Sequence, residues 1–241
     1  MIVELIEHPE NADALANVSA KACISESMPY MDIEDTEYKA LRIALKSGHE
    51  SVIEHCSFTF SIEGISRACS HQLVRHRLAS YSQQSQRYVR LSPFGYVIPE
   101  TVESKDYQRD NYEWAMKVID KVYNQLIAYG VPEEDARYVL PNACTTNIVL
   151  TMNARELRHF FALRCCNRAQ WEIRQLANIM LSLCKEVAPV IFEDAGPSCK
   201  VLGHCPEARP CGKVVFDGHR THNNPVRPSA HKGCCQMPIK Y

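Results

Sequence analysis

The sequence predicts an α+β fold in which a central, mostly antiparallel sheet is flanked by long helices. The strictly alternating segment 57–63 predicts a strand, and the segments 1–8 and 145–151 are also strand-like. Segments 107–129 and 170–186 instead repeat apolar residues at helical spacing. Strands and helices are interspersed along one chain without an internal repeat, so we expect one α+β domain.

Further helices are predicted between these segments. We expect helices over the Ala-rich segment 11–27, over 36–45 up to Gly48, from Ile65 into the basic stretch that follows, and over 132–140. A helix also begins after Asn153, which is a suitable N-cap, and Glu156 at the N3 position resembles a capping box. Residues 88–91 are a candidate short strand.

Composition narrows the class of protein. The chain has 241 residues and a net charge of −1, so no global basic field draws it to nucleic acid. No apolar run reaches the roughly 20 residues that a membrane-spanning helix needs. The first residues lack the pattern of a signal peptide, and we expect a cytoplasmic protein with no membrane or nucleic-acid partner.

The most informative stretch is 75–88, RHRLASYSQQSQRY, which is rich in donors and has no acidic residue. Such a stretch suits phosphate, carboxylate or a uracil-like carbonyl edge, although a solvated basic helix end is the plainer interpretation. Helical spacing predicts that Gln72, Arg75 and His76 share one helix face. Downstream, Arg164 lies on an apolar stripe, which is costly unless an anion or a carboxylate meets its charge.

The last residues lose the periodic apolar pattern of the rest of the chain, which predicts a separate, partly disordered tail over 198–241. This tail contains Cys199, His204, Cys205, Cys211, His219, His222, Cys234 and Cys235. These are enough ligands for zinc, but the paired CxxC spacing of firm zinc sites is missing. We therefore expect no metal site, and ordering of the tail against the protein surface is the alternative. In the body of the chain, His49 and its neighbours also lack the HExxH spacing of a metal site.

Several motifs together resemble the flavin-dependent thymidylate synthase family. Arg75-His76-Arg77, seven residues and then Ser85-Gln86-Arg87 match its RHR-x7-S-x-R signature. The blocks GHES at 48–51, ARYVLP at 136–141, NAR at 153–155 and AQWEIR at 169–174 follow in the family's order. The resemblance covers 1–197, which we interpret as the catalytic domain.

The resemblance implies an activity and an assembly. Such enzymes methylate dUMP to dTMP with 5,10-methylenetetrahydrofolate as the carbon donor. NADPH reduces bound FAD, and FADH2 supplies the hydride. The family forms homotetramers whose active sites lie where subunits meet.

The resemblance also implies residue roles. By position, the FAD ligands are Ser51, Arg75, His76, Arg77, Asn153, Arg155 and His159. The dUMP ligands are Gln72, Ser85, Gln86, Arg87, Arg137 and Arg164. Arg164, Ser85 and His49 are the candidate catalytic residues, with His49 close to the flavin.

Two questions stay open at the level of sequence. Ser85 has no acidic residue in its motif and no base at a supporting distance, so we favour a positioning hydroxyl over a nucleophile. A folate- and flavin-dependent methyltransferase acting on uridine in RNA is the alternative activity. A nucleic-acid-binding module that uses 75–90 as a basic stripe is the alternative outside enzymes.

Overall fold

One antiparallel sheet organises the protein, for which a computed structural model describes residues 1–31 and 35–212. Its strands are β1 (Ile2–Glu7), β2 (Ser57–Ser66), β3 (Ala79–Gln83) and β4 (Thr145–Asn153). They pair in the order β1-β2-β4-β3, and every neighbouring pair is antiparallel. The α+β class and the antiparallel sheet predicted from the sequence are confirmed.

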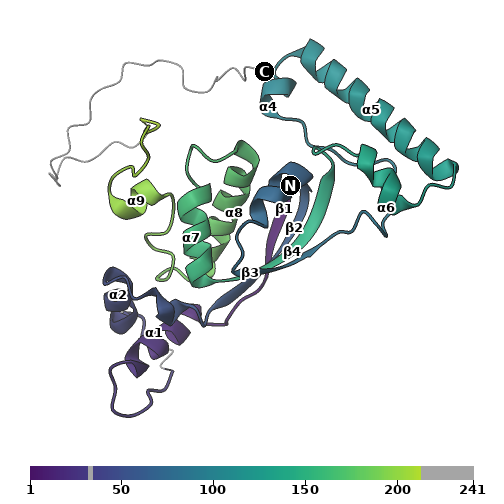
Figure 1. Cartoon of the computed structure of the whole chain (residues 1–241). Helices are drawn as coiled ribbons and strands as arrows, with labels where there is room; N and C mark the ends of the chain where they lie inside the picture. The colour runs from purple at the N-terminus through teal and green to yellow at the C-terminus, as the bar shows by residue number, and fades with distance from the viewer. Residues whose placement is uncertain (32–34, 213–241) are drawn as a thin grey trace.

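The helices gather around the sheet in three groups (Figure 1). Beside the sheet lie α3 (Arg67–Leu73), α7 (Ala154–Arg164) and α8 (Trp171–Val187). One end carries α1 (Ala12–Ala22), α2 (Lys39–Lys46) and the 3₁₀ turn η1 (Glu50–Ile53). The opposite end carries α4 (Glu100–Glu103), α5 (Asp106–Ala128), α6 (Glu133–Ala136) and the 3₁₀ turn η2 (Arg137–Val139). A short helix, α9 (Ser198–Leu202), lies beside α7.

The main core lies between the sheet and α7 and α8. Alternate residues of β2, Phe58, Phe60 and Ile62, are at most 1 % exposed, which matches the predicted alternation. They pack in one cluster with Phe160 and Phe161 of α7. Each such side chain contributes roughly 1.5–3 kcal/mol by leaving water, so this packing fixes α7 on the sheet.

The turn from β2 into α3 differs from the prediction. Gly64 does not end the strand: its positive φ of 74° accompanies a bulge between Ile62 and Ile65, and the strand continues to Ser66. A bulge inserts a residue without ending the pairing, which a simple alternation pattern does not reveal. Ser66 then caps α3 through a 3.0 Å bond from the Cys69 amide.

The basic stretch also folds differently from expectation. The helix ends at Leu73, so the prediction that Gln72, Arg75 and His76 share one helix face is wrong. Residues 88–91 are not a strand, and β3 instead occupies residues 79–83. This edge strand is polar, with Ser80 and Ser82 exposed, and its pairing with β4 rather than its own pattern makes it a strand.

The first strand and the two long helices agree with their predicted bounds to within a residue or two, whereas α1 ends at Ala22 rather than near residue 27 and α2 begins at Lys39 rather than at residue 36. The two long helices are α5 and α8, and Gly48 and Gly130 adopt positive φ after α2 and α5. Asn153 caps α7 by accepting a 2.9 Å bond from the Glu156 amide. Within the described residues, no helix is long and apolar enough to cross a membrane.

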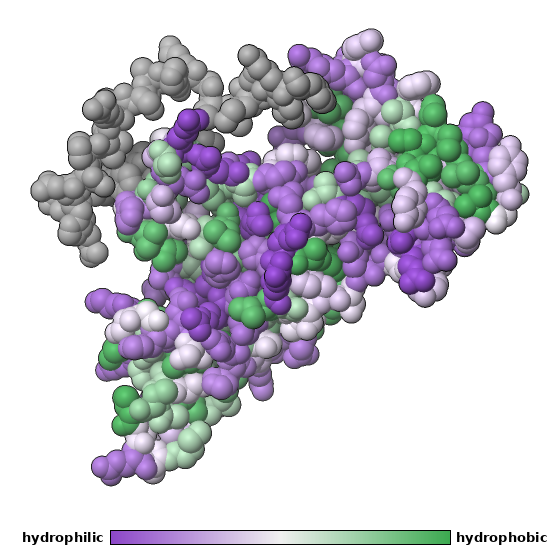
Figure 2. Space-filling view, viewed as in Figure 1, coloured by the Kyte–Doolittle hydropathy of each residue, from purple (hydrophilic) through white to green (hydrophobic). Residues whose placement is uncertain are grey.

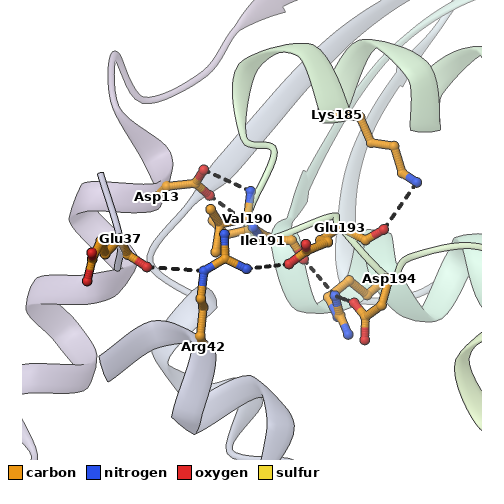
Figure 3. A network of polar contacts seen from close by, with 9 residues as sticks. Asp13, Glu37, Arg42, Lys185, Val190, Ile191, Glu193 and Asp194 are labelled. Atoms are coloured by element: carbon orange, nitrogen blue, oxygen red, sulfur yellow. Dashed lines mark hydrogen bonds and ion pairs between the residues drawn. The ribbon is translucent and has the colours of Figure 1, made fainter. Parts of the chain in front are cut away.

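A polar network ties the first helices to the segment after α8 (Figure 3). The Asp13 carboxylate, 3 % exposed, accepts 2.9 Å bonds from the backbone amides of Val190 and Ile191. Arg42 of α2 pairs with Glu193 in the same segment. Burial raises the pKa of Asp13, although the two amides act to lower it. Burying this carboxylate therefore costs free energy, and the two amide bonds offset part of that cost.

The α5 end is packed more sparsely than the sheet. Only Met116 and Tyr123 of this helix are buried, and a separate small cluster forms around Phe94, Met116 and Cys144. Trp114, Val118 and Val122 recur every four residues, so they form an apolar stripe on α5, and they are 65 %, 40 % and 38 % exposed. Figure 2 shows apolar residues gathered over this end.

Candidate active site

A large cavity lies along α7 and has a volume of about 710 Å³. That size is in the range of small-molecule and cofactor pockets. Its wall comes from η1, α7 and the segments around Leu78, Ala195 and Val201. The lining residues include three predicted FAD ligands: Asn153, Arg155 and His159.

The cavity wall carries paired charges. Arg158, 8 % exposed, bonds to Glu50 at 3.0 Å and to Asp194 at 2.7 Å. Burial lowers the pKa of Arg158, but these two carboxylates outweigh it and raise the pKa overall. Arg155 pairs with Glu54 at the rim. Arg158 and Glu50 lie 108 positions apart in the chain, so no local pattern in the sequence indicates their pairing.

A hydrogen-bonded chain of three side chains lies beside this cavity. His76 Nδ1 lies 3.2 Å from Glu156 Oε1, and Arg164 Nε donates to His76 Nε2 at 3.1 Å. Burial, then the nearby charges of Arg164 and His159, lower the pKa of His76 to about 4. His76 is therefore neutral at pH 7, and its contact with Glu156 is a hydrogen bond rather than an ion pair.

Two arginines flank this buried histidine and face solvent. Arg75 and Arg77 are exposed, and among residues 1–31 and 35–212 neither side chain has an acidic partner. Arg164 likewise meets only a neutral imidazole in this part of the chain. The three guanidinium groups are therefore available to anionic ligands.

A second group of predicted ligands lies around α6. Ser85 Oγ accepts a 3.1 Å bond from the Arg87 amide, and Arg87 pairs with Glu134 at 3.1 Å. Arg137 Nε donates to the carbonyl oxygen of Glu134 at 2.9 Å. Glu134 thus contacts two of the predicted dUMP ligands, Arg87 and Arg137. Glu134 lies in the first turn of α6, where acidic residues are common.

The two groups are separated by β3. Arg75 to Arg77 precede this strand and Ser85 to Arg87 follow it, so they lie at opposite ends. The strand spans five residues, or roughly 14 Å at about 3.4 Å per residue. A strand paired with β4 therefore joins the two halves of the motif.

The remaining predicted residues are placed less distinctively. Ser51 and His49 are exposed around η1 and do not line the large cavity. Gln72 Nε2 donates to Ala68 O at 3.3 Å within α3. Gln86 Nε2 lies 3.8 Å from the Cys144 sulfur, next to Ser85 and Arg87 of the second group.

The described part of the tail packs against the end of α7. Ser198 Oγ donates to Ala162 O at 3.0 Å, and Arg168 donates to Arg209 O at 2.7 Å. A second cavity of about 330 Å³ is lined there by Arg164 and by four cysteines, Cys166, Cys199, Cys205 and Cys211. Within the described residues, no three potential ligands are placed to hold a metal ion. His219, His222, Cys234 and Cys235 lie outside the described residues.

These features define a class of protein: an α+β enzyme with a large pocket, a buried neutral histidine and several guanidinium groups open to anionic ligands. Comparisons with known proteins agree. Residues 4–190 match the family model described as "Thymidylate synthase complementing protein".

Similar named proteins narrow the class further. The chain is 52 % identical over 223 residues to a protein of Geobacter sulfurreducens, covering 89 % of this chain and 95 % of the relative. It is 48 % identical over 234 residues to a protein of Clostridium tetani, with 88 % and 94 % coverage. Both are named "Flavin-dependent thymidylate synthase". The chain belongs to the flavin-dependent thymidylate synthase family.

Proposed function

We propose that this chain converts dUMP to dTMP, with 5,10-methylenetetrahydrofolate as the carbon donor, and that its residues divide this task between the two groups. When bound, FAD that NADPH has reduced supplies the hydride which completes the methyl group. One observation supports this residue assignment most strongly. The guanidinium of Arg164 is half-buried, and within the described residues it hydrogen-bonds only to a neutral histidine.

The large cavity and its flanking arginines are the proposed FAD site. Asn153, Arg155 and His159 line the cavity, and buried His76 lies with its ring 6.0 Å from that of His159. Arg75 and Arg77, which lack acidic partners within the described residues, supply donors for the two phosphates of the cofactor. Ser51 and His49 sit on and beside η1, the turn that forms one wall, and we assign them to the rim of this site.

The α6 group is the proposed site of the dUMP phosphate. Arg87 and Arg137 present two guanidinium groups, which suit a phosphate dianion, and Glu134 holds them in one place. Ser85, Gln86 and Gln72 complete this side by positioning the nucleotide. Arg164 meets the uracil edge, where its charge favours ionisation of N3 and activates C5 toward the one-carbon unit.

The same geometry supports a homotetramer with active sites at subunit junctions. Arg137 belongs to the α6 end and Arg164 to α7, and the strand β3 separates the two halves of the motif. The exposed stripe of Trp114, Val118 and Val122 offers an apolar surface for another subunit. A nucleotide that needs both Arg137 and Arg164 is thus bound most simply where two chains meet.

Residues 1–197 form the proposed catalytic domain, with 198–241 as an appended tail, and we propose a cytoplasmic location. The tail is not separate from the site, because Val201 lines the large cavity and Cys199 lines the small one beside Arg164. Deleting the tail thus tests whether it covers the cofactor pocket.

Anaerobic turnover tests the proposal. Purified protein loaded with FAD should release tritium from [5-³H]dUMP when NADPH and 5,10-methylenetetrahydrofolate are supplied. The same assay on a chain ending at Pro197 measures the contribution of the tail. A protein that cannot be loaded with FAD, or that releases tritium only from uridine in RNA, would contradict the proposed function.

A further inference from the structure

We propose that Glu156 is a positioning residue for Arg164 and acts through the imidazole of His76. In this arrangement the carboxylate holds His76 with its proton on Nδ1, so that Nε2 accepts a hydrogen bond from Arg164. The proposal rests on the proposed role of Arg164 at the uracil edge and assigns the group that holds Arg164 there.

The three side chains are connected by direct contacts. Glu156 Oε1 lies 3.2 Å from His76 Nδ1, and His76 Nε2 accepts from Arg164 Nε at 3.1 Å. Glu156 is 7 % exposed and His76 6 %, so water competes little for these bonds. Glu156 and Arg164 are eight residues apart on α7, and Phe160 between them packs edge-on against the His76 ring at 4.9 Å.

The hydrogen-bonding capacities leave one arrangement of protons. An arginine Nε–H can only donate, so the nitrogen that faces it must carry a lone pair. A neutral imidazole with its lone pair on Nε2 carries its proton on Nδ1, and that proton needs an acceptor. An ionised carboxylate is an acceptor only, which Glu156 supplies. A doubly protonated His76 would instead set one donor against another.

The electrostatics of the site agree with a neutral His76. Burial is the main cause of its lowered pKa, and the positive charge of Arg164 and the neighbouring His159 add to it. Burial also raises the pKa of Glu156, which His159 partly offsets. The lowered pKa of His76 disfavours a doubly protonated ring and so favours the hydrogen-bonded chain that the geometry shows.

The remaining contacts of His76 do not determine its ring protons. The Tyr81 hydroxyl donates to the backbone carbonyl of His76 at 2.7 Å, which fixes the chain but not the imidazole. Glu156 lies at the position of a capping-box glutamate, yet its carboxylate faces His76. Glu156 therefore does more than stabilise the first turn of α7, because its carboxylate also contacts His76.

Nuclear magnetic resonance of the unmodified protein tests the tautomer directly. Protein labelled with ¹⁵N in the histidine rings should show Nδ1 of His76 protonated and Nε2 unprotonated at pH 7, with His76→Gln identifying the signals. The opposite tautomer, or a doubly protonated ring, would overturn the proposal. This measurement needs neither cofactor nor turnover.

Binding measurements then test the coupling. Glu156→Leu removes the acceptor, and we expect the dissociation constant of dUMP on the FAD-loaded enzyme to rise about tenfold or more. Glu156→Gln keeps an oxygen that can accept from Nδ1, so it should recover most of the affinity. In an Arg164→Ala background, Glu156→Leu should cause little further loss, since its effect passes through Arg164.

The controls separate this coupling from folding and from the proposed function. Glu172→Gln alters another buried glutamate, which accepts from the Ser66 amide at 2.6 Å, and should lower Tm while leaving dUMP affinity unchanged. Equal losses from Glu156→Leu with and without Arg164 would overturn the proposal. If wild-type protein does not turn over dUMP, the proposed function fails, whereas the tautomer measurement still decides the hydrogen-bonded chain.

Discussion

The two ends of β3 belong to regions of very different construction. At the α7 side, His76, Glu156 and Arg158 are each less than 9 % exposed and are satisfied by bonds within the described residues of one chain. At the α6 side, Arg87 and Glu134 are about half exposed and pair with each other at the surface. The buried polar groups of the first region are paired within one chain, whereas the α6 side presents its charged groups to a ligand or another subunit.

This difference predicts how substitutions act. Changes in the buried region should affect both folding and chemistry, because buried polar groups that lose partners are costly. Changes in the α6 region should affect substrate binding or assembly while leaving the fold intact, because exposed ion pairs contribute little to stability.

Arg164→Ala should have the largest effect on activity. The substitution removes the guanidinium proposed to meet the uracil edge, and kcat should fall by about 10²-fold or more, the loss typical of a removed transition-state donor. FAD should stay bound, because the cofactor cavity is formed by other residues. Stopped-flow flavin oxidation and the FAD content after gel filtration measure the two effects.

Arg168→Ala is the matched control for this change. Arg168 lies four residues further on, where it pairs with Glu207 and donates to Arg209 O of the tail. Its loss should leave turnover nearly unchanged. Simultaneous loss of flavin and of the oligomer in Arg164→Ala would show that this arginine belongs to the structure rather than to the dUMP site.

Trp114→Glu should disrupt assembly. A charge placed in the exposed apolar stripe of α5 would have to be buried at the proposed subunit junction, at a cost of several kcal/mol. Light scattering should show smaller particles, and turnover should fall with them. Lys117→Glu adds negative charge to an exposed position of the same helix and should leave the particle size unchanged. A tetramer that persists in Trp114→Glu would place the junction elsewhere.

Asp13→Ala should have the largest effect on stability. It leaves the amides of Val190 and Ile191 without their acceptor in a buried site, at roughly 2–4 kcal/mol in total. Urea unfolding measures the loss. Glu134→Ala, at the sparse end, should change the unfolding free energy by less than about 1 kcal/mol while weakening dUMP binding.

His76 should make stability fall in mild acid. Its pKa is about 4 in the folded protein, below the ordinary value of 6.5, so the unfolded chain takes up the proton first. Stability from this group is full above pH 6.5 and is lost as the pH falls toward 4. Between pH 6.5 and pH 5 the loss should approach about 2 kcal/mol, at 1.36 kcal/mol per pKa unit.

Comparison with His76→Asn isolates this contribution. Glu156 acts in the opposite sense, because its raised pKa means that acid relieves the cost of burying its charge. The unfolding free energies of the wild-type protein and of His76→Asn are measured at pH 7 and pH 5. Taking the difference between the two proteins removes the contribution of the other titrating groups. An identical pH dependence in the two proteins would mean that the pKa of His76 is the same in the folded and the unfolded chain.

The sequence was informative where a pattern is local. The alternation of β2, the helical period of α5 and α8, and the caps at Asn153 and Gly130 depend on neighbours in the chain, and the structure confirms them. The edge strand β3 was missed because its five residues are polar, and only its partner β4 makes it a strand. The α3 boundary was wrong because a bulge at Gly64 extends β2.

The residues of the candidate site show the same difference between local patterns and long-range contacts. The family resemblance named Asn153, Arg155, His159 and Arg164, but not Glu54, which pairs with Arg155, or Glu156, which bonds to His76. Glu156 carried a usable signal, since Glu156, Phe160 and Arg164 are spaced by four on one helix face. Glu50, Asp194 and Glu134 carried none, because their partners lie far away in the sequence and meet only in the folded chain.

Ser85→Ala should have the smallest effect, and its size decides the role of the hydroxyl. Ser85 Oγ accepts a local bond from the Arg87 amide, and no basic side chain bonds to it within the described residues. A nucleophile needs a base within hydrogen-bond reach, whereas a hydroxyl that orients Arg87 does not. We therefore expect KM for dUMP to rise by roughly three- to tenfold, as for one lost neutral hydrogen bond, with kcat largely kept. Complete loss of turnover with dUMP still bound would instead make Ser85 the nucleophile and the exposed end of β3 the centre of the chemistry.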